Sequence, residues 1–356
     1  IDPLLKEIHW KYAAQILKTA YICAKTPDVY PVYVSSFRCA PDSFAVDYFK
    51  LIMEKENKPY LVLELDEHDS SVGYETRIEA SVQAFTNHQK SLAASNTSDT
   101  RPTESNDRNR YASLHPRYLE KFGSKTIIFP NWDSLSGQLI VSVFKNEGYQ
   151  ALLMEENEET LKKGMLTNTG QCIPLNAVAS GYIHTVEKNG LDPENTVLWL
   201  NHSEIACNIK MYPYHIQKIL DQHGEGFEKT HIFLGEFSLF DISFRASTNA
   251  YYAYMFSGLL KSVGCRIRPY EIIPGETDKA LAKAMAILCQ AFETGGSKEA
   301  ALKECRQLFL QIKTQPQPRP KVAIYGDLYV RDNDVMNQDL IRFIEHHGNS
   351  YEFINL

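Results

Sequence analysis

The sequence lacks the long apolar run that a membrane-spanning helix requires. No stretch of about 18 or more apolar residues occurs in the chain. Its first 17 residues have the apolar spacing of an amphipathic helix, without the basic start and apolar run of a signal peptide. Its seven cysteines are an odd number and lack the spacing of a disulfide framework. Because disulfides are rare in reducing compartments, we expect an intracellular, cytoplasmic protein.

Signs of nucleic-acid and nucleotide binding are also missing. The net charge of −7 gives no reason to expect a nucleic-acid partner or an acidic membrane surface. The chain contains no G-x-G-x-x-G, Walker A or G-x-S-x-G pattern. These absences argue against a dinucleotide-binding fingerprint, a P-loop and the nucleophile elbow of a hydrolase.

What the sequence does contain is an alternation of apolar runs with helical patterns. Two strands are predicted in the first third of the chain, at 29–37 and 59–68. Four more follow, at 124–132, 149–155, 195–201 and 230–237. Alternation at these lengths is typical of a parallel sheet covered by helices. We therefore expect an α/β protein of flavodoxin-like or Rossmann-like subdomains with mostly parallel sheets, plus long helices at 277–294 and 297–313.

Composition divides the chain into regions. Residues 86–117 are rich in Ser, Thr, Asn and Asp and poor in apolar residues, which predicts a flexible linker. A second linker, rich in proline, is predicted after the long helices. A strand predicted at 321–330 opens the last region, which is either the start of a third α/β unit or a segment that returns to the first region. The predicted regions are 1–85, 86–117, 118–313, 314–320 and 321–356.

Three cysteines stand where a predicted strand or loop gives way to a helix: Cys39, Cys172 and Cys207. A helix N-terminus lowers the pKa of a thiol and stabilises anionic ligands. Their separations of 133 and 35 residues match no zinc-finger spacing. Thiolate ligands alone favour an iron–sulfur cluster or zinc, and three of them leave one position open. Unligated loop thiols remain the alternative at this stage.

The other four cysteines have the pattern of small buried apolar residues. Cys23, Cys289 and Cys305 fall within predicted helices, and Cys265 begins a predicted strand.

A charged group follows the second predicted strand, in ELDEHDSS (64–71). Glu64, Asp66, Glu67 and His68 could serve in acid–base chemistry or hold a metal. The alternative is a charged loop that only faces solvent.

These stretches carry a family resemblance. VYVSSFRCAPDSFAVDYF (32–49) and KPYLVLELDEHDSSVGYETRIEA (58–80) closely resemble the C-terminal region of the large 2-hydroxyacyl-CoA dehydratase activase-related proteins. Further on, GQCIP (170–174), SEIACNIKMY (203–212) and YGDLYVRDND (325–334) are similar to later elements of that family. The first third of the chain gives the most specific match.

The resemblance implies a cofactor and its ligands. Such proteins join ATPase activase modules to a region like the dehydratase D-component, in which three cysteines bind a 4Fe–4S cluster that air can destroy. The resemblance therefore implies that Cys39, Cys172 and Cys207 hold a 4Fe–4S cluster. It also implies supporting or proton-handling roles for His68 and Glu64, and charge balance for Arg77.

The resemblance further implies partners. An ATPase activase module, in the same or a partner polypeptide, drives electron transfer in anaerobic metabolism, and acyl-CoA contacts the cluster in the dehydratases. No ATPase module lies within this chain. The element around Cys207 keeps only that cysteine and Tyr212 of its usual residues. The alternatives are therefore a structural or interaction region without a cluster, and a zinc-binding α/β domain.

Overall fold

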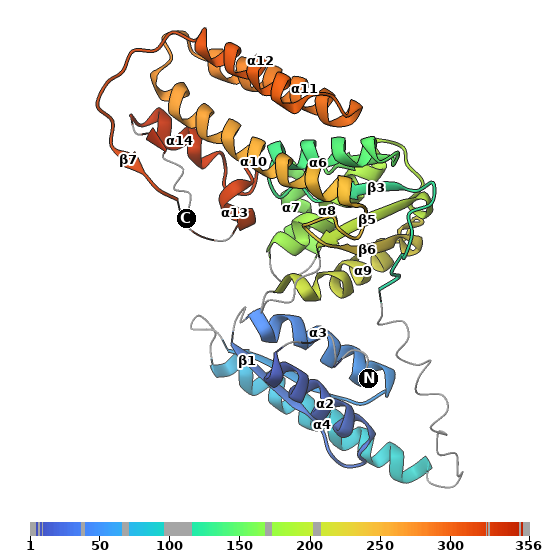
Figure 1. The fold of residues 1–356 in the computed structure, drawn as a ribbon. Coiled ribbons are helices and arrows are strands. Elements are labelled where there is room, and N and C mark those ends of the chain that lie inside the picture. Colours follow the sequence, from blue (N-terminus) through green and yellow to red (C-terminus); the bar gives the residue numbers. More distant parts are fainter. Residues whose placement is uncertain are drawn as a thin grey trace. The chain divides into compact units, whose positions relative to one another are not determined.

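The computed structural model shows an α/β protein with parallel sheets, which confirms the predicted fold class (Figure 1). Its described residues form two compact units. Unit 1 holds the described residues of 1–116, 168–175 and 203–216, and unit 2 holds the others. The structure describes residues 5, 8, 10–36, 40–65, 71–95, 116–167, 173–201, 208–324, 326, 328–348 and 350–351.

Unit 2 is built on a four-stranded parallel sheet. Its strands are β3 (Thr126–Phe129), β4 (Ala151–Leu153), β5 (Thr196–Asn201) and β6 (His231–Gly235), and their order across the sheet is β4-β3-β5-β6. All four strands were predicted. β3 and β5 are buried along their whole length, as expected for strands covered on both faces. The order reverses between β3 and β5, which is the position where open α/β sheets collect ligands.

Helices cover both faces of this sheet (Figure 1). On one side lie α6 (Ser134–Asn146) and α10 (Phe244–Ile267), and on the other lie α8 (Ile173–Lys188) and the part of α9 (Tyr212–His223) that belongs to unit 2. The shorter connecting elements are α7 (Glu158–Thr167), η3 (Pro193–Asn195), η4 (Asn208–Met211), η5 (Phe227–Lys229) and η6 (Arg268–Tyr270).

The core between the sheet and α6 is aromatic. Phe144 of α6 packs its ring 4.8 Å from that of Phe129 and 5.1 Å from that of Trp199. Gly235, at the end of β6, leaves room for this packing. A Cβ atom at Gly235 would come within 1.9 Å of the Trp199 ring. The indole of Trp199 therefore fits only because the neighbouring strand has a glycine at this position.

Two long helices extend α10 into a helical layer. They are α11 (Glu276–Thr294) and α12 (Lys298–Leu310), close to the predicted ranges. The strand predicted at Cys265 was wrong, because α10 continues to Ile267. Gly264 lies inside this helix and allows close packing, because a Cβ atom there would come within 2.8 Å of Leu281 on α11.

The last region is mostly helical and belongs to unit 2. Of the strand predicted at 321–330, the described residues form only β7 (Lys321–Val322), which pairs in parallel with β8 (Ser350–Tyr351). α13 (Leu328–Asp332) and α14 (Leu340–His346) lie between them. Residues 328–332 form a helical turn in place of the expected strand. Helical spacing brings Tyr329 and Asn333 to the same face of this turn, where both side chains hydrogen-bond Glu156.

Unit 1 contains a two-stranded parallel sheet, in which β1 (Val32–Ser36) pairs with β2 (Leu61–Leu65). Helices α2 (Lys11–Lys25), α3 (Ala40–Lys55) and α4 (Ser71–Ser95) accompany it. The prediction that a linker begins at residue 86 was wrong for its first ten residues, since α4 runs to Ser95. Tyr30 explains this extension, because it stacks on Phe85 at 4.7 Å and hydrogen-bonds His88 at 2.8 Å.

Within the described part of the chain, none of the helices combines the length and the apolar character needed to cross a bilayer.

Candidate functional site

The three cysteines proposed as cluster ligands, Cys39, Cys172 and Cys207, lie outside the described residues, and so does His68. Their described neighbours follow the predicted pattern. The residues immediately after the three cysteines are Ala40, which begins α3, Ile173, which begins α8, and Asn208, which begins η4 and leads into α9. Each cysteine therefore directly precedes a helix in the sequence.

These helix starts belong to one compact unit. Residues 173–175 and 208–216 group with α3 in unit 1, although the chain between them belongs to unit 2. Segments that are more than 100 residues apart in the sequence are thus gathered into one body.

The described residues around Cys39 and Cys207 contact one another. His215 of α9 is buried, and its ring lies 4.8 Å from that of Phe44 and 5.0 Å from that of Tyr48 on α3. The Asp47 carboxylate lies 3.8 Å from His215 Nδ1. On the other side of Cys39, the Ser35 hydroxyl of β1 donates to the Asp42 carboxylate at 3.0 Å. These contacts fix the first turns of α3 and the start of α9 against each other.

Asp66 and Glu67 of the predicted acid–base group also lie outside the described residues. Glu64 of that group and Arg77, predicted to balance charge, are described and are not brought together. Glu64, at the end of β2, is exposed, and its carbonyl oxygen accepts a hydrogen bond from the Tyr74 hydroxyl at 3.2 Å. Arg77 is exposed on α4. Glu64 and Arg77 share no hydrogen bond or ion pair, which favours the alternative of solvent-facing charges for these two side chains.

Unit 2 has a cavity of about 380 Å³ at the carboxyl end of its sheet. It lies where β3 and β5 end, at the point where the strand order reverses. The loop after β3, the first turns of α6, one face of α10, and α13 complete its wall. The sequence did not reveal this cavity, although the end of β3 in FPNWD (129–133) places an indole and a carboxylate where ligands collect.

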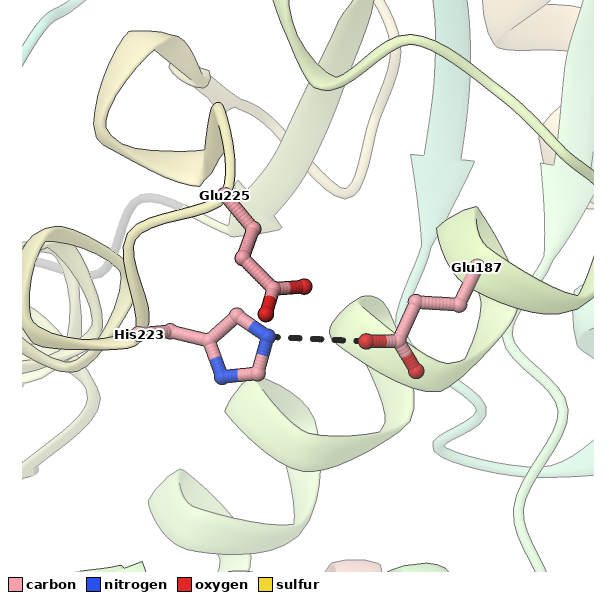
Figure 2. Close-up of side chains that lie close together, drawn as sticks. All are labelled: Glu187, His223 and Glu225. Carbon is pink, nitrogen blue, oxygen red and sulfur yellow. Dashed lines mark ion pairs between the residues drawn. The ribbon is translucent and has the colours of Figure 1, made fainter.

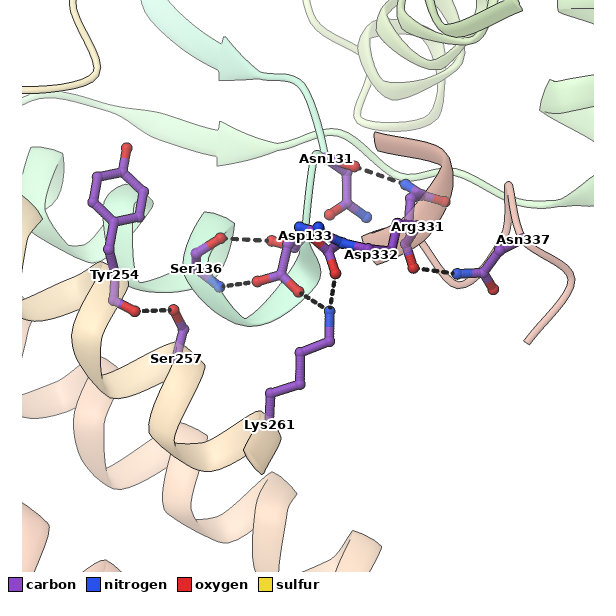
Figure 3. Close-up of polar contacts among 10 residues, drawn as sticks. Asn131, Asp133, Ser136, Tyr254, Ser257, Lys261, Arg331, Asp332 and Asn337 are labelled. Atoms are coloured by element: carbon purple, nitrogen blue, oxygen red, sulfur yellow. Dashed lines mark hydrogen bonds and ion pairs between the residues drawn. The ribbon is translucent and has the colours of Figure 1, made fainter. Parts of the chain in front are cut away.

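A cluster of charged side chains lines one side of the cavity (Figure 3). Asp133 caps α6 by accepting a hydrogen bond from the Ser136 amide at 2.9 Å. The Lys261 ammonium of α10 lies between the carboxylates of Asp133, at 3.2 Å, and Asp332, at 3.0 Å. Arg331 donates to the other oxygen of Asp332 at 2.7 Å.

The charges in this cluster sustain each other. Burial disfavours the ammonium form of Lys261, but the carboxylates of Asp133 and Asp332 outweigh it, and the pKa of Lys261 is raised. Burial likewise disfavours ionised Asp332, but Arg331 and Lys261 outweigh it, and the pKa of Asp332 is lowered. Lys261 and Asp332 are therefore ionised near neutral pH, and the two cationic side chains of the cluster lie against two carboxyl side chains.

A second polar group lies beyond the end of β4. The Glu156 carboxyl accepts hydrogen bonds from the Tyr329 hydroxyl at 2.9 Å and from Asn333 Nδ2 at 2.5 Å. Asn333 Nδ2 also donates to the Asn131 carbonyl oxygen at 2.7 Å. Burial raises the pKa of Glu156 to about 7, although both hydrogen bonds act in the opposite direction. This carboxyl can therefore gain or lose a proton near neutral pH.

Glu187, His223 and Glu225 come together on the surface of unit 2 (Figure 2). One ligand atom from each lies within 4.8 Å of the others, and His223 Nε2 is 3.5 Å from Glu187 Oε1. All three residues are exposed. Exposed carboxylate–histidine contacts are common on protein surfaces and are weak, so this group alone does not define a metal centre.

The four described cysteines lie within helices. Cys265 and Cys305 are buried, as predicted, whereas Cys23 and Cys289 are partly exposed. Burial raises the pKa of the Cys265, Cys289 and Cys305 thiols, which keeps them protonated at neutral pH. They are thus poor metal ligands and suitable control positions.

Comparisons with protein-family models, with curated proteins and with solved structures found no match to this chain.

Proposed function

We propose that this chain is an iron–sulfur electron-transfer component, or domain, of a 2-hydroxyacyl-CoA dehydratase or activase-like system. A 4Fe–4S cluster would be held by Cys39, Cys172 and Cys207, with one iron position open. An ATPase activase module, in the same or a partner polypeptide, would drive electron transfer to the cluster. The proposed substrate is an acyl-CoA that contacts the cluster. The setting would be an anaerobic cytoplasm.

The observation that carries the proposal is the grouping of the three helix starts in unit 1. Each of the three cysteines directly precedes one of these helices, α3, α8 and the η4–α9 pair. A helix start offers backbone N–H groups and a positive dipole end, which suit an anionic thiolate–sulfide centre. The ring contacts of His215 with Phe44 and Tyr48 hold two of these starts together. The donor set of three thiolates fits a cluster of this kind.

The test is metal content after anaerobic purification. We expect brown protein with about four irons and four sulfides per chain, as one 4Fe–4S cluster requires. Replacing Cys39, Cys172 or Cys207 with serine, one at a time, should lower iron and sulfide sharply, because each removal opens a further ligand position. Colourless protein that resists reconstitution with iron and sulfide would contradict the proposal.

Cys289 provides a matched control for these variants. It is a partly exposed helical cysteine in unit 2, and its thiol is protonated at neutral pH. Cys289→Ser should leave iron and sulfide at the wild-type level. An equal loss in this variant would show that the effect of the other three is general damage to the fold.

The same measurements separate the two alternatives. A zinc site on the same cysteines would give zinc and no sulfide in elemental analysis. A structural or interaction region without a cluster would give no metal in any variant. Its main support is the altered sequence around Cys207. Full iron in the Cys207→Ser variant would instead indicate a cluster that does not use this ligand.

A further inference from the structure

The cavity at the carboxyl end of the unit 2 sheet has the position and size of a small-molecule site. Its volume of about 380 Å³ lies near the lower end of the range for ligand pockets, roughly 300–1,000 Å³. It opens where β3 and β5 end and the strand order reverses, so no strand or crossover helix fills the space.

The apolar walls of the cavity are mostly aromatic. Trp199 and Phe129 form its floor on β5 and β3, and Trp132, Phe237 and Tyr254 stand around it. The Trp132 indole is fixed by a hydrogen bond from its Nε1 to Asn201 Oδ1 at 3.1 Å. Aromatic faces attract flat rings by offset or edge-to-face packing. These walls therefore favour a flat ring over a branched aliphatic compound.

The polar side of the cavity favours a ligand without net charge. The two cations, Lys261 and Arg331, are matched by the carboxylates of Asp133 and Asp332. An anionic or cationic ligand would have to displace an existing ion pair. An uncharged ligand can instead accept from the cations and donate to the carboxylates along one edge.

One glycine keeps this cavity open. Tyr254, Ser257, Gly258 and Lys261 follow helical spacing and present one face of α10 to the cavity. A Cβ atom at Gly258 would meet no other atom within 4 Å. A side chain at this position would extend into the cavity without a clash at its first carbon.

From these observations we propose that the cavity binds a flat, uncharged heteroaromatic ring system, of about two fused rings, that both donates and accepts hydrogen bonds along one edge. The aromatic walls stack on its faces, and the ion cluster of Asp133, Lys261, Arg331 and Asp332 contacts its polar edge. The proposal concerns unit 2 only and does not depend on the cluster.

The test uses the full chain and two bicyclic probes. Quinazolin-4-one is flat and uncharged and has an N–H and a carbonyl on one edge, whereas naphthalene-1-sulfonate is flat and anionic. Binding is measured by isothermal titration calorimetry and by ligand-observed NMR. We expect quinazolin-4-one to bind and to bind more tightly than the sulfonate. Gly258→Leu should raise its Kd at least tenfold by filling the cavity.

Two further variants make the result decisive. Thr248→Leu places the same side chain at an exposed position of α10 outside the cavity and should leave the Kd unchanged. Gly258→Ala adds only a methyl group, preserves the helix, and should raise the Kd two- to fivefold even if the leucine variant unfolds. The proposal is overturned if quinazolin-4-one fails to bind, if the sulfonate binds more tightly, or if the substitutions at Gly258 leave the affinity unchanged.

Discussion

At the scale of single residues, Glu156 has the most unusual chemistry among the described carboxyl groups. It is held by Tyr329 and Asn333, and its pKa is raised to about 7 from an ordinary value of 4.5. The folded protein therefore holds this proton more tightly than the unfolded chain. Stability from this group is fully present below pH 4.5 and is lost as the pH rises towards 7.

We accordingly predict that ionisation of Glu156 favours opening of α13, because opening lets water reach the buried carboxylate, although the hydrogen bonds from Tyr329 and Asn333 oppose it. As the pH rises from about 5 to 8, the free energy of unfolding should lose up to about 3 kcal/mol from this one carboxyl. Amide exchange at residues 328–333 should speed up over the same range. Glu156→Gln should remove most of this pH dependence, because the amide does not ionise.

Glu155→Gln is the matched control for this prediction. Glu155 is the neighbouring residue, it is exposed, and it pairs with Lys188 on the surface. Its replacement should leave the pH profile close to that of the wild type. A wild-type profile that is flat between pH 5 and 8 would show that Glu156 is not the raised group described above.

The contacts of Glu156 could not be predicted from the sequence. Its partners lie 173 and 177 residues further along the chain, so no local pattern marks them. The charged stretch beginning at Glu64 can be recognised in the sequence because its charged residues are close neighbours. Of that stretch and Arg77, the described side chains are exposed and unconnected. Residues 66–70 of that stretch lie outside the described residues, so its proposed role stays a prediction.

At the scale of secondary-structure elements, the strands of unit 2 were predictable because each is a buried apolar run between turn residues. The errors came where tertiary packing overrides local preference. Gly264 lies inside α10, at a place where a side chain would clash with Leu281 on α11. Tyr30 supports the polar end of α4 through Phe85 and His88. Neither partner could be recognised from the local sequence.

Two glycines of unit 2 give a paired prediction about its elements. Gly235→Ala should destabilise the fold by about 1–3 kcal/mol, because the new methyl group overlaps the Trp199 ring and forces it to move. Gly258→Ala should stabilise it by about 0.5–1 kcal/mol, because alanine is the better helix former and space is open. Urea denaturation of both variants measures the difference. Equal effects of the two substitutions would contradict this account of the packing.

At the scale of the whole molecule, the chain passes between the two units more than once. Unit 1 takes residues from 168–175 and 203–216 in addition to its N-terminal part. The predicted division into consecutive regions, with one boundary in 86–117, stays a prediction for the residues of that range beyond Ser95. The interleaving could not be predicted, because it depends on which helix starts pack together and not on composition.

A fragment of residues 117–356 tests this division. It contains the four-stranded sheet and the aromatic core of unit 2, so we expect cooperative thermal unfolding and a helical circular dichroism spectrum. Its midpoint should be lower than that of the full chain, since His215 loses its ring contacts with Phe44 and Tyr48. Without Cys39 it should also fail to retain iron. Full iron in this fragment would contradict the proposed ligand set.

The central claim is that Cys39, Cys172 and Cys207 form one site, and the most direct measurement is an anaerobic crystal structure recorded at the iron absorption edge. We predict one iron cluster with the three cysteine sulfurs within roughly 7 Å of one another, as ligation of a single cluster requires. Three sulfurs directed into separate parts of the protein, with no anomalous iron signal between them, would contradict the account.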